Sequence, residues 1–101
     1  MKMLLHVNFP HEIFNKYTKD GTVGEKLKKI LDEIKPEAVY FTEQWGHRGA
    51  IMLVNLASES DVPKLAEPWF LVFNADVKFH IVMTPEMLEK AGLDKLGKKW
   101  T

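Results

Sequence analysis

The chain has 101 residues, the size of one domain, so we treat 1–101 as a single folded unit. Its 14 Lys plus Arg residues balance 14 Asp plus Glu residues, and all but one of the cations are scattered lysines, which argues against a nucleic-acid partner. Cysteine is absent, which excludes disulfides, thiolate catalysis and sulfur-rich zinc sites. No apolar run approaches the roughly 20 residues that cross a bilayer, and no signal peptide is recognisable, so we expect a cytoplasmic protein without a membrane partner.

The N-terminal part of the chain predicts a strand followed by a helix in two pieces. Residues 2–9 alternate between apolar and polar side chains, as a half-buried strand does. A short helix over 11–17 follows, and the Lys-Asp-Gly stretch at 19–21 breaks it. A second piece begins at a capping box of Thr22 with Glu25 and ends before Pro36.

The middle of the chain predicts a β-hairpin. Residues 37–45 and 50–56 are rich in β-branched and aromatic side chains, which favour strands. Gly46, His47, Arg48 and Gly49 stand between them as the hairpin connection, with glycines available for positive φ.

A further helix, strand and helix complete the predicted elements. Ser58 or Ser60 caps a helix that Asn74 closes, and Pro68 should kink or interrupt it. Residues 76–83 alternate again and predict the last strand. Thr84 followed by Pro85 opens a short C-terminal helix that ends at Gly92, and the remaining tail is basic.

The order of these elements predicts a ferredoxin-like α+β fold. Two β-α-β crossovers joined by a hairpin give a four-stranded antiparallel sheet in the order 4-1-3-2, with the helices on one face. The third strand is apolar on both parities, whereas a solvated sheet face should be polar. We therefore expect a second copy of the chain to cover the open face, in a homodimer.

One long stretch carries a resemblance to a known group of proteins. The sequence EPWFLVFNADVKFHIVMTPEML at 67–88, together with the element order, resembles small bacterial proteins of a domain-of-unknown-function family in the dimeric α+β barrel superfamily. The resemblance implies two sheets that face one another across a dimer. It also implies relatives among cofactor-free monooxygenases, muconolactone isomerase-like enzymes, haem-dependent enzymes and proteins of no known activity. No catalytic motif can be transferred to this chain residue by residue.

Two histidines on neighbouring strands are the first candidate site. His6 and His80 lie on the polar parity of strands that the predicted order places side by side, so their rings could touch, share a proton or hold a metal. Tyr40 is placed near them as a hydrogen-bond donor. The same histidines could instead be hydrogen-bonded groups in a dimer interface. A metal site ranks last because it needs three or four ligands and the sequence offers no close-spaced pair.

The hairpin connection and the last long helix supply the remaining candidates. Arg48 and His47 could contact a ligand or a partner chain, or Arg48 could simply pair with Glu43 at an exposed turn. Trp69 and Phe73 read first as core residues and second as the walls of a ligand pocket.

We expect, on these grounds, a homodimeric α+β barrel protein that binds or transforms a small apolar or aromatic molecule without a cofactor. Its catalytic residues would be His80, His6 and Tyr40, and its ligand-binding residues Arg48, His47, Trp69 and Phe73. The alternative is a non-catalytic regulatory or assembly module. The residues decide neither the substrate nor whether the protein is an enzyme.

Overall fold

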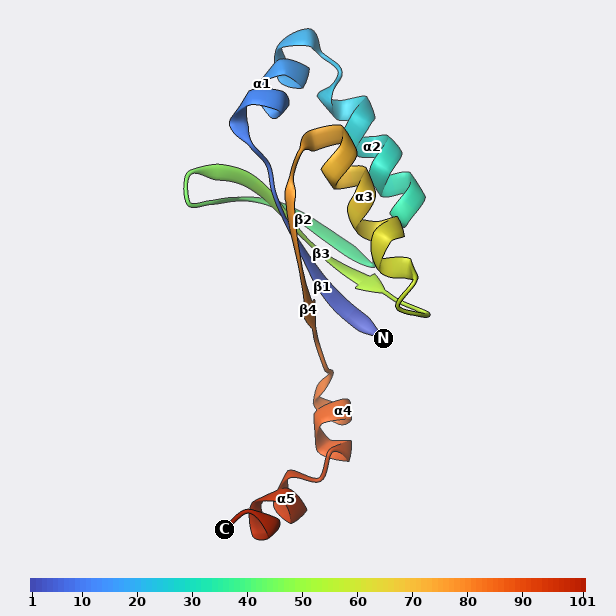
Figure 1. Cartoon of the computed structure of the whole chain (residues 1–101), viewed down its shortest axis with the longest axis vertical. Helices are drawn as coiled ribbons and strands as arrows, with labels where there is room; N and C mark the ends of the chain where they lie inside the picture. The colour runs from blue at the N-terminus through green and yellow to red at the C-terminus, as the bar shows by residue number, and fades with distance from the viewer.

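A computed structural model describes all residues from 1 to 101 and shows one antiparallel sheet with three helices on one face and a C-terminal extension (Figure 1). The elements follow one another as β1 (Lys2–Asn8), α1 (His11–Asp20), α2 (Val23–Ile34), β2 (Ala38–Gln44), β3 (His47–Asn55), α3 (Asp61–Phe73), β4 (Asp76–Ile81), α4 (Pro85–Lys90) and α5 (Leu93–Lys99). The body of the chain therefore has the predicted β-α-β-β-α-β order, with its first helix in two pieces.

The four strands lie in the order β2-β3-β1-β4, and every neighbouring pair is antiparallel. Counted from the β4 edge, the same order is 4-1-3-2. Residues directly opposite one another in an antiparallel ladder point to the same face of the sheet. One face is turned toward the helices, and the other, which we call the open face, has no element of this chain packed on it (Figure 1).

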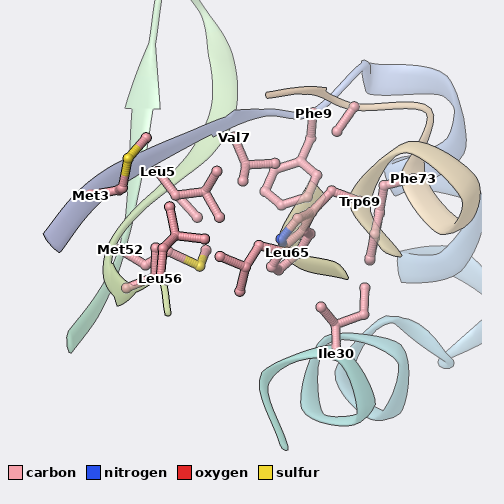
Figure 2. Close-up of a cluster of buried hydrophobic side chains, with 13 residues drawn as sticks. Met3, Leu5, Val7, Phe9, Ile30, Met52, Leu56, Leu65, Trp69 and Phe73 are labelled. Carbon is pink, nitrogen blue, oxygen red and sulfur yellow. The ribbon is translucent and has the colours of Figure 1, made fainter. Parts of the chain in front are cut away.

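The core fills the space between the sheet and the helices (Figure 2). Alternate residues of β1 and β3 point into it, as the period of two requires, and α3 supplies its largest side chains. Trp69, Phe73 and Phe9 are almost fully buried and pack against one another at ring-centroid distances of 5.0 to 6.1 Å. Edge-to-face and tilted contacts of this kind add to the burial of the rings, so this aromatic cluster joins α3 to the start of α1.

The breaks between the helices differ in detail from the prediction. The helix α1 continues past residue 17 to Asp20, and Gly21 ends it in the left-handed conformation, at φ 80°. Thr22 stands at the N-cap of α2, but its side chain donates to the Asp20 carboxylate at 2.6 Å and makes no capping bond. The predicted capping box with Glu25 is therefore wrong, because the Thr22 side chain accepts no backbone amide of α2.

The helix α3 runs without interruption through Pro68, contrary to one predicted outcome. The residues on either side of this proline, Leu65 and Trp69, are buried against the sheet, and their packing holds the helix together despite the missing backbone donor. Neither Ser58 nor Ser60 caps the helix through its side chain. Instead the Asp61 carboxylate accepts the backbone N–H groups of Ala57 and Ser58 at 3.0 and 3.3 Å, which fixes the entry into α3.

The hairpin turn lies earlier than predicted. Gln44 pairs with His47, so Trp45 and Gly46 alone form the connection, and His47, Arg48 and Gly49 belong to β3. Both turn residues have positive φ, 56° and 78°. This is the signature of a two-residue type I′ turn, whose twist matches that of the flanking strands.

The chain beyond β4 extends away from the body (Figure 1). Thr84 caps α4 as predicted, accepting from the Met87 amide at 3.2 Å, but the tail forms a further helix, α5, that the sequence did not lead us to expect. The molecule measures 60 × 29 × 19 Å, with a radius of gyration of 17.1 Å against about 13 Å for a compact chain of this length. None of the helices has both the length and the apolar character that a membrane crossing requires.

Replacing Asp61 with Asn tests the carboxylate at the start of α3. Two backbone amides donate to it, so its pKa lies below the ordinary value. A lowered pKa stabilises the folded state above the carboxyl's unfolded pKa and loses that contribution as the pH falls through the folded value. We expect Asp61→Asn to lower the midpoint of thermal unfolding at pH 7, and the difference from wild type to shrink below about pH 4. A difference that stays constant down to pH 2 would contradict this assignment.

Candidate functional site

The open face of the sheet combines an apolar strip with a polar margin. The strip lies on the central strands and consists of Leu4, Ile51 and Leu53, which the antiparallel pairing places side by side. The margin lies on β4, where Asp76, Lys78 and His80 alternate with residues of the core face. Because apolar and charged groups adjoin on one surface, this face could hold a molecule with both apolar and polar parts.

The two histidines lie together at the junction of strip and margin. The register pairs Leu4 with His80 and His6 with Lys78, so His6 and His80 are diagonal neighbours on the same face. Their rings meet edge to face, with centroids 5.1 Å apart and planes at 76°. The predicted placement of the pair on neighbouring strands and one face is confirmed.

A hollow of about 240 Å³ opens beside this pair. Its floor comes from β1 and β4, and one wall comes from the end of the β2–β3 hairpin. The lining residues are His6, Val7, Asn8, Gln44, Trp45, Asp76, Lys78 and His80. Six of these eight residues are polar, whereas the sequence predicted an apolar pocket beside the histidines. The apolar surface lies next to the hollow, on the strip, because the charges of β4 occupy its edge.

Trp45 is the most unusual member of this lining. Its side chain is 87 % exposed, and its φ of 56° lies in the left-handed region. Asn, Asp or Gly normally take this first position of a type I′ turn, and a bulky side chain there is strained by roughly 1–3 kcal/mol. A large aromatic ring held in solvent at a strained turn is favourable neither for folding nor for solubility, which points to a contact with something outside the monomer.

Tyr40 lies on the same face as the histidines but not beside them. Its register partner is Ile51, whose other neighbour is His6, so one strand separates the phenol from the histidine pair. The ring is 71 % exposed and does not line the hollow. The predicted grouping of Tyr40 with His6 and His80 is therefore wrong within one copy of the chain.

Arg48 is held inside the molecule. It points to the helix side of the sheet, where its guanidinium donates to the Asn15 side chain at 2.8 Å and lies 4.5 Å from the ring centre of Phe14. Glu43, its cross-strand partner, instead accepts from the Gly46 amide at 3.0 Å. Arg48 thus links β3 to α1 and makes no ion pair with Glu43, while its contact with a ligand or a partner chain stays a prediction.

His47 also makes contact within the chain. Its ring stacks on that of His11, with centroids 4.4 Å apart, and its Nδ1 lies 3.2 Å from the backbone oxygen of Trp45. The predicted ligand-binding role of His47 therefore competes with a structural one, in which the hairpin end packs against the start of α1.

Trp69 and Phe73 belong to the core and not to a pocket wall. Both are fully buried in the monomer, and neither lines the hollow beside the histidines. The alternative that treated them as core residues describes them, and their predicted ligand-binding role is wrong for this hollow.

Asp76, Lys78 and Gln44 are site residues that the sequence reasoning missed. Asp76 and Lys78 share the parity of His80, so the alternation of β4 could have revealed them once His80 was singled out. Gln44 enters only through the curvature of the hairpin. No group of three or more His, Cys, Asp and Glu residues is assembled as a metal site. What the hollow offers is hydrogen bonding and proton transfer, by two imidazoles, a carboxylate and an ammonium group.

Comparison with known proteins adds little to this geometry. No family model matches the chain, and no curated protein matches it. Among solved structures, the de novo designed protein Ferredog-Diesel is similar over 80 % of this chain and 85 % of its own, with 15 % identity and a TM-score of 0.45. The ferredoxin-like fold rests on the strand order and connections of the chain itself.

Replacing Trp45 with Asn tests whether the turn residue is retained at a cost in stability. The change creates Asn-Gly, the preferred type I′ pair, and we expect it to stabilise the fold by about 1 kcal/mol in urea unfolding. The matched control is Trp45→Ala, which keeps the strained φ and should bring no such gain. Equal stability of the Asn and Ala variants would contradict the strain at this position.

Proposed function

We propose that the protein is a homodimeric small-molecule-binding protein of the α+β barrel type, which holds a small aromatic compound with a polar substituent against its open sheet face. The observation that carries this proposal is the convergence of His6, His80 and the exposed ring of Trp45 on one hollow. An indole ring supplies a stacking surface, while imidazole and ammonium groups supply hydrogen bonds and charge.

The size of the hollow supports a shared site. Ligand sites commonly enclose about 300–1,000 Å³, and the hollow of one copy holds about 240 Å³ and opens to solvent. In a monomer, the adjacent strip of Leu4, Ile51 and Leu53 would also stay partly exposed to solvent. A second copy placed over the open face would enclose the hollow and bury the strip together.

Catalysis would use the histidine pair, if the bound molecule is also transformed. One imidazole can take a proton from an acidic C–H or O–H group while the other, or Lys78, stabilises the charge that develops. Such proton transfer is the chemistry of an isomerase or of a cofactor-free oxygenase acting on an aromatic substrate. Tyr40 has no part in this step within one copy, because it lies outside the hollow.

The second candidate is a non-catalytic module that binds a regulatory molecule or only assembles. The contacts of His47 and Arg48 favour it, because the side chains first considered as ligand contacts serve to fix the hairpin to α1. Under this reading the histidine pair would be part of the surface between two copies.

The double variant His6→Gln, His80→Gln separates these readings. We expect the wild-type protein to bind a simple aromatic acid such as salicylate, followed by shifts of the Trp45 indole resonance in NMR titration, and the double variant to bind at least tenfold more weakly. Glutamine keeps hydrogen-bonding capacity but cannot transfer protons or carry the imidazolium charge. The thermal midpoint and the sedimentation coefficient of the variant should stay those of wild type.

His11→Gln is the matched control, because His11 stacks on His47 outside the hollow. It should leave the titration unchanged. Dissociation of the double variant into monomers would show that the two histidines belong to the interface. Equal binding of a panel of aromatic acids by wild type and double variant would remove the proposed site.

A further inference from the structure

The C-terminal arm, residues 83–101, forms no backbone hydrogen bond with the rest of its own chain and packs no residue on its core. The last backbone bond to the body is from the Val82 amide to the Lys2 carbonyl at 3.3 Å, and all bonds beyond it are local to the arm. No residue of the arm belongs to the core or packs against it. Figure 1 shows the arm leaving the end of β4 in the direction away from the helices.

The two helices of the arm are too short to persist by themselves. The helix α4 has 6 residues and α5 has 7, whereas isolated helices below about 12–15 residues are marginal in water. Their ends are nevertheless well formed, with Thr84 capping α4 and Gly92 in the left-handed conformation between them. Helices this short require a packed surface, and this chain offers the arm none.

The arm carries the apolar face that such packing needs. Leu93, Leu96 and Trp100 recur at helical spacing on one side of α5, and Met87 and Leu88 extend the surface onto α4. All five are exposed, and Trp100 is 76 % exposed. Lys98 lies on the opposite side of α5, as expected for a helix with one side buried and one side in water.

The chain exposes more surface to solvent than a compact monomer of its mass, and the excess is large enough for a protein–protein interface. The chain exposes 7337 Å², whereas a compact monomer of 11.7 kDa exposes about 5,900 Å². The excess, roughly 1,400 Å², is more than the roughly 800 Å² that each partner buries in a standard stable interface. A second copy of this chain can remove this excess by accepting the arm.

We propose that two copies exchange their arms, so that α4 and α5 of each copy pack on the open sheet face of the other. The dimensions agree: four strands span about 14–19 Å, and the two helices add up to about 20 Å in length. The apolar side of the arm meets the strip of Leu4, Ile51 and Leu53, and the twofold relation buries both open faces at once. The result is a sheet with helices on both faces, in which the partner's arm, and not the partner's sheet as in an α+β barrel, covers the open face.

This inference rests on the homodimer of the proposed function, but not on its α+β barrel arrangement or on its ligand. It assigns the cover of the histidine hollow to the partner's arm, which lies over the strip next to His6 and His80. Only three residues, 82–84, separate β4 from α4, so a return of the arm onto its own open face would require a sharp reversal within them. Exchange between copies needs no such reversal.

Sedimentation of the full chain at micromolar concentration gives the first test. Wild type should sediment as a dimer of twice 11.7 kDa, and Leu93→Glu, Leu96→Glu should raise the dissociation constant at least 100-fold while the circular dichroism of the body persists. The matched control is Lys95→Glu, Lys98→Glu, which changes charge on α5 away from the apolar side and should stay dimeric. A monomeric wild type would overturn the homodimer and the exchange together, whereas a dimeric Leu93→Glu, Leu96→Glu variant would overturn the exchange alone.

The absence of cysteine from the chain allows a second, positional test. Chains with Leu96→Cys are mixed with chains that carry Ile51→Cys, and one of the two is tagged. A short bis-maleimide should join the two kinds of chain. In the control, Lys98→Cys replaces Leu96→Cys, and far less of the joined product should form. Joining of Leu96→Cys chains only to each other would mean that arms pair with arms, which overturns the proposal. The wild type could also be monomeric and sediment with phosphatidylserine vesicles in a way that requires Leu93 and Leu96. This result would assign the arm to a membrane surface and would equally overturn the proposal.

Discussion

The apolar character of both faces of the central strands is the constraint on which the rest of this structure depends. On the helix side, alternate residues of β1 and β3 enter a core closed by the aromatic cluster of α3. On the open side the same strands present Leu4, Ile51 and Leu53. Apolar area is worth about 25 cal/mol per Å² when removed from water, so a sheet patterned in this way is most stable with a second cover.

The proposed site lies where that apolar surface ends. Toward β4 the open face changes to histidines, lysine and aspartate, and the hairpin end brings the ring of Trp45 over the same margin. Polar groups at the edge of a covered face keep some access to water. When a ligand displaces that water, their hydrogen bonds discriminate more strongly between ligands. The proposed association would therefore account together for the strained aromatic turn and the two touching imidazoles, as parts of one site.

The alternation of side chains accounts for most of what the sequence could predict. A period of two placed His6 and His80 on one face, and the β-α-β connections fixed which strands are neighbours. The errors arose where tertiary contacts decide. Trp45 and Gly46, and not the whole stretch from Gly46 to Gly49, form the turn, because the register of β2 with β3 begins at His47. Arg48 was expected at an exposed turn, but it belongs to β3 and shares the parity of the buried Ala50 and Met52, so it points to the helix side and reaches Asn15 on α1.

The predicted grouping of Tyr40 with the histidines shows that the alternation of side chains along a strand does not predict which residues are close together. Parity identifies the face of a sheet on which a side chain lies, but the distance along that face depends on the strand order, and β3 separates the tyrosine from β1. The second short helix of the tail was missed for a different reason. Its stripe of Leu93, Leu96 and Trp100 is too short to be stable in isolation, so the sequence alone resembles a solvated tail.

Amide hydrogen exchange of the arm as a function of protein concentration tests the central claim most directly, because exchange reports whether short helices are packed. The amides of Leu88, Leu96 and Trp100 donate within the arm. If a second copy covers the open face with this segment, these amides are protected at high concentration and lose protection when dilution separates the copies, while the core amides of β1 stay protected. Exchange of the arm at the rate of an unfolded peptide at every concentration, beside a protected core, would contradict the account.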